Sequence, residues 1–259
     1  MCCRYRQKAP GRGISKIFLT IYAFSVNIME KKNKLLTWIV IISLVAFMVL
    51  ASLFMSQFIP KSDERVFAEN INKVVEIRVS NDQSSWGYGT GSFVASDGTI
   101  LTNKHMVFNQ TLNSNYEYVE VRLPTSNNFV SAQILNISQS ADLATIKIEK
   151  TDCQYFKVSE NIKNGQTIYT IGNPNGFGLS FTKGNVSASL RNVVYNAQTI
   201  SAIQTSLVIN EGNSGGPVFN QNGELLGLIS FRLKDNNANV IQGVSFAVPA
   251  IEIKSFLAN

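Results

Sequence analysis

The feature that most constrains the fold is a series of short strand-like runs that fills the chain from about residue 70 to residue 250. Turn residues such as Gly, Asn and Asp separate the runs, and no rhythm of strands alternating with helices appears, which argues against a parallel α/β sheet. Many short strands at near-regular spacing predict an all-β barrel or sandwich. The runs are residues 74–79, 87–94, 99–102, 116–123, 129–137, 143–148, 167–171, 181–189, 201–208, 217–219, 225–231 and 243–248.

The two ends of the chain have a different pattern. At the C-terminus, Pro249 stands at a helix start and apolar residues follow on one face, which predicts a terminal helix within residues 249–259 packed on the barrel. Near the N-terminus, Leu35 to Met55 is a run of 21 residues without a charge, about 30 Å long as a helix. It predicts a transmembrane helix over residues 35–56, with a cleaved signal peptide as the alternative.

Charge gives this helix an orientation. Lys31, Lys32 and Lys34 precede the apolar run, so the positive-inside rule places a basic tail, residues 1–34, in the cytoplasm. The rest of the chain then lies outside the cytoplasm, beginning with a polar linker over residues 57–69. Met29 opens a second, cleaner N-terminus, and we interpret residues 1–28 as an extension that precedes the true start.

Composition excludes several kinds of site. The net charge of +6 resides in the tail, so the folded part has no basic patch in sequence and nucleic acid is not expected as a partner. One histidine and no Cys/His cluster argue against a metal site, and no cofactor is expected. Cys153 is the only cysteine beyond the tail, and we interpret it as a small apolar residue.

Three stretches carry residues suited to nucleophilic chemistry. Gly212-Asn213-Ser214-Gly215-Gly216-Pro217 predicts a tight turn that exposes the Ser214 hydroxyl and leaves main-chain amides within Gly212, Asn213 and Ser214 to form an oxyanion hole. His105, the only histidine, ends a strand, and Asp142 opens another. A base that takes the serine proton and a carboxylate that orients the imidazole are what this chemistry requires. Each signal alone also fits an ordinary turn or surface residue.

The stretches around these residues resemble the HtrA/DegP branch of the chymotrypsin-like serine proteases. The matching segments, in the order of that family, are 91–94 with 97–105, 141–148, 171–174, 184–187, 209–217 and 243–249. The resemblance implies His105 as general base, Asp142 as orienting residue and Ser214 as nucleophile. It also implies two perpendicular six-stranded antiparallel β-barrels, over residues 70–160 and 161–248, with the site between them. A homotrimer is common in the family, and no residue in this sequence compels one.

The sequence also departs from the family pattern. Lys104 and Met106 flank the histidine in place of small and β-branched residues, and Glu211 stands where proline is common. Only ten residues follow Pro249, so a PDZ domain, with the peptide-tail regulation and cage assembly that it supports, is not expected.

The pocket beside the nucleophile is expected to be apolar and to lack a carboxylate, which disfavours Lys or Arg before the scissile bond. These observations favour a membrane-anchored serine endopeptidase that cleaves unfolded extracytoplasmic proteins after small or medium aliphatic residues, in protein quality control. The alternative is a peptide-binding chaperone or receptor that keeps the fold without proteolysis. The residues expected to line the pocket are Val208, Ile209, Leu228, Ile229, Ser230 and Phe231.

Overall fold

The structure, a computed structural model, describes residues 34–56, 60–195, 198–234 and 240–258. They divide into two units after Pro60. In the first unit, helix α2 (Lys34–Ser56) contains an 18-residue span, Trp38–Met55, with a mean hydropathy of 2.7 and no buried residue. Among the described residues it is the one helix long and apolar enough to cross a membrane. The proposed start at Met29 and nearly all of the basic tail lie outside the described residues.

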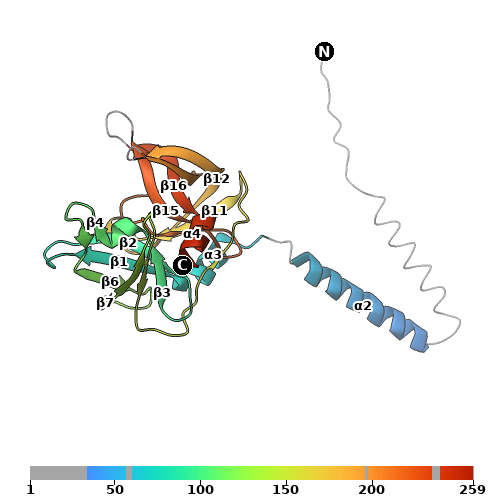
Figure 1. The fold of residues 1–259 in the computed structure, drawn as a ribbon. Helices are drawn as coiled ribbons and strands as arrows, with labels where there is room; N and C mark the ends of the chain where they lie inside the picture. Colours follow the sequence, from blue (N-terminus) through green and yellow to red (C-terminus); the bar gives the residue numbers. More distant parts are fainter. Residues whose placement is uncertain (1–33, 57–59, 196–197, 235–239, 259) are drawn as a thin grey trace, which may run out of the picture. The chain divides into compact units, whose positions relative to one another are not determined.

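The first barrel of the second unit is a ring of antiparallel strands (Figure 1, teal to green). Its strand order is β7-β6-β1-β2-β3-β9-β8. Only Ala132 separates β7 from β8, and its amide donates to the carbonyl of Val119, so residues 130–137 act as a single strand that pairs with β6 at one end and β9 at the other. The ring therefore closes with six strands. The bounds are β1 (Val74–Ser80), β2 (Gly87–Phe93), β3 (Thr99–Thr102), β6 (Tyr118–Arg122), β7 (Val130–Ser131), β8 (Gln133–Ile137) and β9 (Ala144–Lys147), with a small hairpin of β4 (Phe108–Asn109) and β5 (Ser114–Asn115).

The second barrel also closes with six strands (Figure 1, yellow to red). Its order is β15-β14-β11-β12-β13-β16, and β15 pairs with β16 to complete the ring. The short strand β10 adds to β15 in parallel. The two barrels confirm the predicted all-β architecture. The bounds are β10 (Lys157–Val158), β11 (Thr167–Gly172), β12 (Ser180–Tyr195), β13 (Gln198–Thr205), β14 (Pro217–Phe219), β15 (Glu224–Lys234) and β16 (Val240–Pro249).

Strand β6 shows how the sequence pattern produces a barrel wall. Val119 and Val121 are buried in the first core, while Glu120 and Arg122 alternate with them on the outer face. Each outer residue forms an ion pair with its cross-strand partner on β1: Glu120 with Arg78, and Arg122 with Glu76. The period-two pattern thus fixes which face is buried, and the charge pairs match the register.

A buried cluster between the barrels positions the segments that carry the site. It joins Leu101 and Leu143 of the first barrel to Tyr169 and Leu228 of the second. Leu101 lies four residues before His105, Leu143 directly follows Asp142, and Leu228 lies two residues before Ser230. Because all four side chains are at most 3% exposed, moving any of these segments would disrupt close packing.

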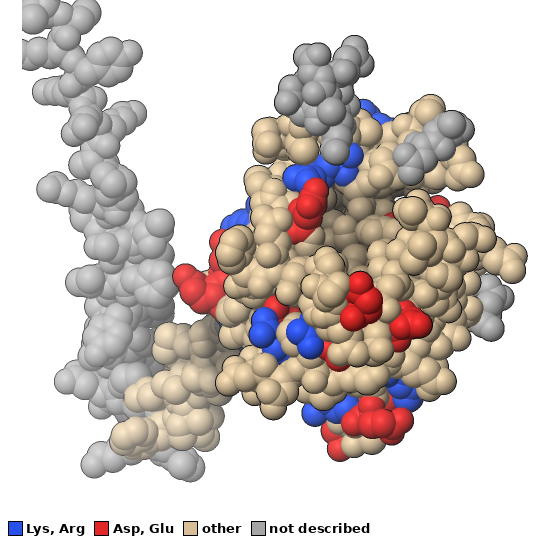
Figure 2. Space-filling model, turned by 90° about the vertical axis from the view of Figure 1, so that its left-hand side faces the viewer, with Lys and Arg blue, Asp and Glu red and all other residues tan. Residues whose placement is uncertain are grey.

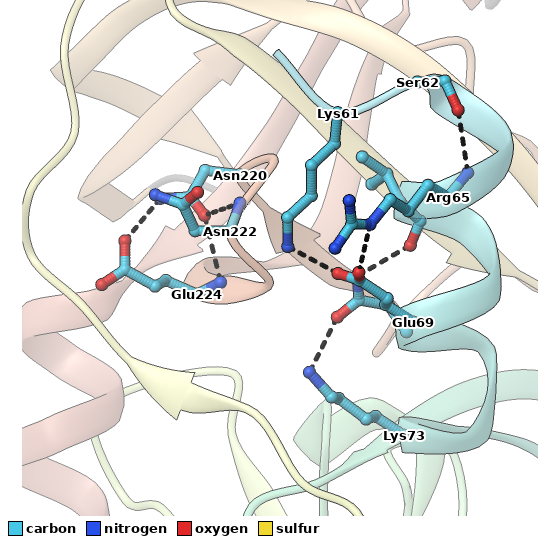
Figure 3. A network of polar contacts seen from close by, with 10 residues as sticks. Lys61, Ser62, Arg65, Glu69, Lys73, Asn220, Asn222 and Glu224 are labelled. Carbon is cyan, nitrogen blue, oxygen red and sulfur yellow. Dashed lines mark hydrogen bonds and ion pairs between the residues drawn. The ribbon is translucent and has the colours of Figure 1, made fainter. Parts of the chain in front are cut away.

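The linker predicted over residues 57–69 contains a helix. Helix α3 (Asp63–Asn70) begins at Ser62, whose hydroxyl accepts a hydrogen bond from the Arg65 amide, and the 3₁₀ turn η1 (Ile71–Lys73) continues it. Val66 is fully buried in the cluster between the barrels. On the polar face, Glu69 accepts from Lys61 and Arg65 beside the turn of residues 220–224 (Figure 3). Residues 61–69 are therefore part of the folded domain.

The C-terminal helix and the surface complete the domain. Helix α4 (Ala250–Leu257) packs against β10, β15 and β16, as expected from its apolar face. Cys153 is 6% exposed and belongs to the first-barrel core, which confirms its interpretation as an apolar residue. On the face of the domain in Figure 2, acidic and basic side chains are interspersed among uncharged ones.

Candidate functional site

His105 and Asp142 are paired in a cleft of the folded domain. His105 lies in the 3₁₀ turn η2 (Lys104–Met106), just after β3, and Asp142 lies just before β9, which pairs with β3. The imidazole Nδ1 is 2.9 Å from Oδ2 and 3.0 Å from Oδ1 of Asp142, and the His105 amide donates to Oδ1 at 3.1 Å. With Nδ1 facing the carboxylate, the other ring nitrogen, Nε2, is left to exchange a proton.

Two further side chains fix the position of Asp142. The hydroxyl of Ser230, on β15 of the second barrel, donates to Oδ2 at 2.6 Å. The buried amide of Asn103 donates to the Asp142 carbonyl oxygen at 2.9 Å. Burial alone would raise the pKa of Asp142, but hydrogen bonds from His105 and Ser230 outweigh burial and hold the pKa below its ordinary value. The carboxylate therefore stays ionised at neutral pH.

The turn before Ser214 is held in one backbone conformation. The Asn213 amide donates to the Asn210 carbonyl at 3.1 Å, and Gly212, at the third position of this turn, has φ +91°. This is the pattern of a type II turn, which requires glycine there. The Glu211 carbonyl accepts from the Asn175 amide at 2.7 Å. Since C=O and N–H point in opposite directions across a trans peptide, the Gly212 amide faces away from Asn175.

The turn that carries Ser214 also contacts the first barrel. Thr90 on β2 donates its amide to the Ser214 carbonyl at 2.9 Å and its hydroxyl to the Gly212 carbonyl at 2.7 Å. A Cβ on Gly215, which has φ +81°, would lie 2.1 Å from the Thr90 carbonyl oxygen, so only glycine allows this approach. Among the hydrogen bonds of the described residues, none uses the amide of Gly212 or Ser214.

Ser214 and His105 line one cavity of about 850 Å³, together with Asp142 and Ser230. Within the described part of the chain no hydrogen bond joins the serine hydroxyl to the imidazole. Such bonds are often long in ligand-free structures and tighten when substrate binds. The arrangement brings together a hydroxyl, a base with an ionised partner and two free amides, which together suit acyl transfer.

The residues expected in the substrate pocket separate into two groups. Ile209, Ser230 and Phe231 line the cavity. Leu228 and Ile229 do not line it, because their side chains are buried in the cores. Val208 does not line it either: β13 ends at Thr205, and the Val208 side chain is 57% exposed. The Asn213 amide was expected among the oxyanion donors, but it donates to the Asn210 carbonyl instead.

Sequence reasoning missed four contributions to this site. Thr90 lies outside the matching segments, and Asn103 lies within the segment 97–105 without a role that the sequence indicates. Their contacts with the site cross 122 and 39 residues of sequence, respectively. Asn175 belongs to a turn-rich loop, but the sequence does not indicate that its amide would hold Glu211. Ser230 was expected in the pocket, and its bond to Asp142 was not foreseen.

Comparison with known proteins agrees with this geometry. The model of the trypsin-like peptidase domain matches residues 89–228. The chain belongs to the trypsin-like peptidase family. Its relatives confirm the resemblance to the HtrA/DegP branch. It is 34% identical over 185 residues to a protein of Pseudomonas putida named "Probable periplasmic serine endoprotease DegP-like", a match that covers 70% of this chain and 36% of the relative.

Other relatives extend this finding. Serine protease HTRA1 of Xenopus tropicalis is 34% identical over 176 residues, which are 66% of this chain and 35% of the relative. A solved structure of the HtrA-type protease AlgW with a tripeptide aligns with a TM-score of 0.64 and 25% identity over 75% of this chain and 63% of that one. A second AlgW structure, at 23% identity, has a TM-score of 0.66 and supports the fold. The chain spans about a third of the length of these curated relatives.

Proposed function

We propose that the protein is a serine endopeptidase with Ser214 as nucleophile, His105 as general base and Asp142 as orienting residue. The observation that carries the proposal is the His105–Asp142 pair, with Nδ1 2.9 Å from the carboxylate, in the same cavity as Ser214. Ser214 Oγ attacks the peptide carbonyl, His105 Nε2 takes its proton and later gives it to the leaving amine, and Asp142 stabilises the imidazolium.

The amides of Gly212 and Ser214 are proposed to hold the oxyanion. Both lack a hydrogen-bond acceptor among the described residues, and the bond from Asn175 to the Glu211 carbonyl supports this orientation of the Gly212 amide. Such donors stabilise charge that develops in the transition state, and each is typically worth about 10²–10³ in rate. The Asn213 amide is not part of this proposal.

The proposed substrates are extended, unfolded polypeptides cleaved after small or medium aliphatic residues. Ile209, Ala202 and Ala247 supply apolar lining in the cavity that contains Ser214. The segment Ser230–Arg232 suits pairing with an extended substrate strand, which a folded protein does not offer. AlgW, whose structure resembles this chain, was solved with a tripeptide, consistent with a groove for extended chain.

We further propose that α2 anchors the protein in the cell membrane and that the peptidase domain works outside the cytoplasm. Its span Trp38–Met55 is apolar and unburied, which favours lipid as its surroundings. The DegP-like relative is named as periplasmic, in keeping with a role in quality control of envelope proteins. In spheroplasts, whose cytoplasmic membrane is intact and accessible, an added protease should remove the folded domain and leave a membrane-bound fragment; a domain protected until the spheroplasts are lysed would contradict this orientation.

Cleavage of a denatured protein by the full-length chain tests the proposed activity. Wild type in detergent should cut denatured casein, with Val, Ala or Ile before most cut bonds, and Ser214→Ala should not cut it. Faster hydrolysis of an Arg peptide than of its Val counterpart would overturn the proposed specificity. If wild type bound denatured casein without cutting it, the peptide-binding chaperone would replace the peptidase.

A further inference from the structure

A second cavity adjoins the proposed catalytic cleft. It has a volume of about 580 Å³ and lies between residues 136–141, the segment that leads into Asp142, and the α4 side chains Glu252, Ser255 and Phe256. Residues 139–141 and Glu252 line both cavities, so the two spaces meet at that point. A substrate bound beside Ser214 would have a side-chain route into the second cavity.

Glu252 is a charged group without a partner at this junction. Its side chain is partly buried, and no hydrogen bond or ion pair involves its carboxylate among the described residues. Burial raises the pKa of Glu252 with no opposing contribution from a neighbouring cation. The nearest cation in sequence, Lys254, pairs with Glu160. Lys104, which also lines the catalytic cavity, donates to the Ser138 carbonyl. A half-buried carboxylate left unpaired is costly, and a ligand cation would relieve that cost.

The surroundings of Glu252 fit a long cationic side chain. Ile137 and Phe256 supply apolar surface for an aliphatic stem, while Ser138, Gln139 and Ser140 supply polar groups near the carboxylate. Lys and Arg side chains combine these two properties. We propose that Glu252 forms a subsite for a lysine or arginine of the substrate, at the second or fourth residue before the scissile bond.

The position follows from the geometry of an extended chain. Successive side chains of a strand point to opposite faces. If the residue before the scissile bond points toward Ile209, the second and fourth residues before it point away from Ile209. Residues 139–141, which precede Asp142, line both cavities and so mark where such side chains can reach Glu252. This subsite rests on the proposed peptidase function, and it is distinct from the apolar pocket for the residue at the cleaved bond.

Peptide hydrolysis by the full-length protein tests the subsite. Peptides with Val before the scissile bond carry either Lys or norleucine, a neutral side chain of similar length, at the second or the fourth position. For wild type, Lys at one of these positions should raise kcat/KM about fivefold to tenfold, mainly through KM, as expected for a partly desolvated ion pair. Glu252→Gln should remove this preference, so that its kcat/KM values for the Lys and norleucine peptides become equal.

A matched variant and a binding measurement make the test decisive. Glu160→Gln removes a neighbouring glutamate that lines neither cavity, and it should keep the Lys preference. Fluorescence anisotropy measures the binding of a labelled Lys peptide to Ser214→Ala. The affinity of this protein for the peptide should fall about fivefold to tenfold when Glu252→Gln is added. Hydrolysis without a Lys preference, or a preference that survives Glu252→Gln, overturns the subsite alone. A wild type that hydrolyses none of the peptides overturns the peptidase and the subsite together.

Discussion

Replacing Ser230 with alanine removes a hydrogen bond that holds Asp142 in place and leaves the Asp142 carboxylate itself unchanged. The Ser230 hydroxyl donates to Oδ2 of Asp142 at 2.6 Å, within the short range of bonds to a charged acceptor. The carboxylate keeps two donors in the variant, the amide and the imidazole Nδ1 of His105. We therefore expect a weakened site that is still assembled, since the carboxylate stays ionised and in contact with the imidazole.

The magnitude follows from the loss of one charge-assisted hydrogen bond. Such a bond is worth roughly 1.5–3 kcal/mol, so the free energy of unfolding at pH 7 should fall by about that amount. The same loss raises the pKa of Asp142 in the variant, because one of the hydrogen bonds that lower it is gone. We expect kcat to fall about tenfold because the imidazole is held less firmly, far less than the roughly 10⁴-fold loss when such a carboxylate is replaced by an amide.

The pH dependence of stability gives a second readout with a definite sign. The pKa of Asp142 in the folded protein lies below its ordinary value, so the carboxylate stabilises the fold above the unfolded pKa of about 4 and loses this contribution as pH falls through the folded pKa. Ser230→Ala raises the folded pKa toward the unfolded value. The two proteins should therefore differ most at pH 7 and converge at low pH.

Urea unfolding in detergent at pH 7 and pH 3, with peptide hydrolysis at pH 7, measures both effects. Ser80→Ala is the matched control, because Ser80 is another buried serine next to an aspartate, Asp82, in the first barrel. It should change stability slightly and leave kcat unaltered. The reasoning is refuted if Ser230→Ala keeps the wild-type kcat, or if it destabilises the protein equally at both pH values.

Three further perturbations test other parts of the structure. Gly212→Ala should lower kcat about 10²–10³-fold, because its Cβ would lie 2.1 Å from the Asn173 carbonyl oxygen. Gly178→Ala is the control, since Gly178 has a similar positive φ with open space around the Cβ. Equal activity of the two variants in peptide hydrolysis would contradict the oxyanion assignment. Hydrogen bonds from Lys147 and Thr99 lower the pKa of Asp97 to about 2. In Asp97→Asn, the free energy of unfolding should therefore fall less between pH 4 and pH 2 than in wild type. An acid unfolding curve identical to that of wild type would argue against a contribution of Asp97 ionisation to stability. Burial raises the pKa of the Cys153 thiol, so iodoacetamide should label Cys153 only after urea unfolding, as read by peptide mass spectrometry; rapid labelling of the native protein would be inconsistent with a core position.

The sequence predicts most of the barrels because local pattern decides strand formation. Each of the twelve predicted runs overlaps a strand of the structure, and Val119 and Val121 alternate with charged residues as an inward-facing pattern requires. The hydrophobic pattern does not predict where a strand ends when the strand continues past the barrel. Strand β12 continues to Tyr195, and β15 to Lys234, because each pairs with a neighbouring strand as a long hairpin.

For the site as well, local sequence pattern predicts some residues and not others. The sequence identifies His105, Asp142 and Ser214 because each stands in a recognisable local motif, and the structure brings all three to one cavity. Thr90 and Ser230 contact the site from strands distant in sequence, so no local signal reveals their partners. Helix α3 was missed for a related reason: it is eight residues long, and contacts of Val66 and Asp63 with the rest of the domain stabilise it.

Labelling with a fluorophosphonate, read by peptide mass spectrometry of the full-length protein, tests the central claim most directly. The reagent phosphonylates a serine only when a base activates it and an oxyanion hole holds the phosphoryl oxygen. The account predicts one adduct on Ser214 in wild type, none on that peptide in Ser214→Ala, and labelling at least 10³-fold slower in His105→Ala. A wild-type protein whose Ser214 stays unlabelled, or is labelled equally fast without His105, would contradict it.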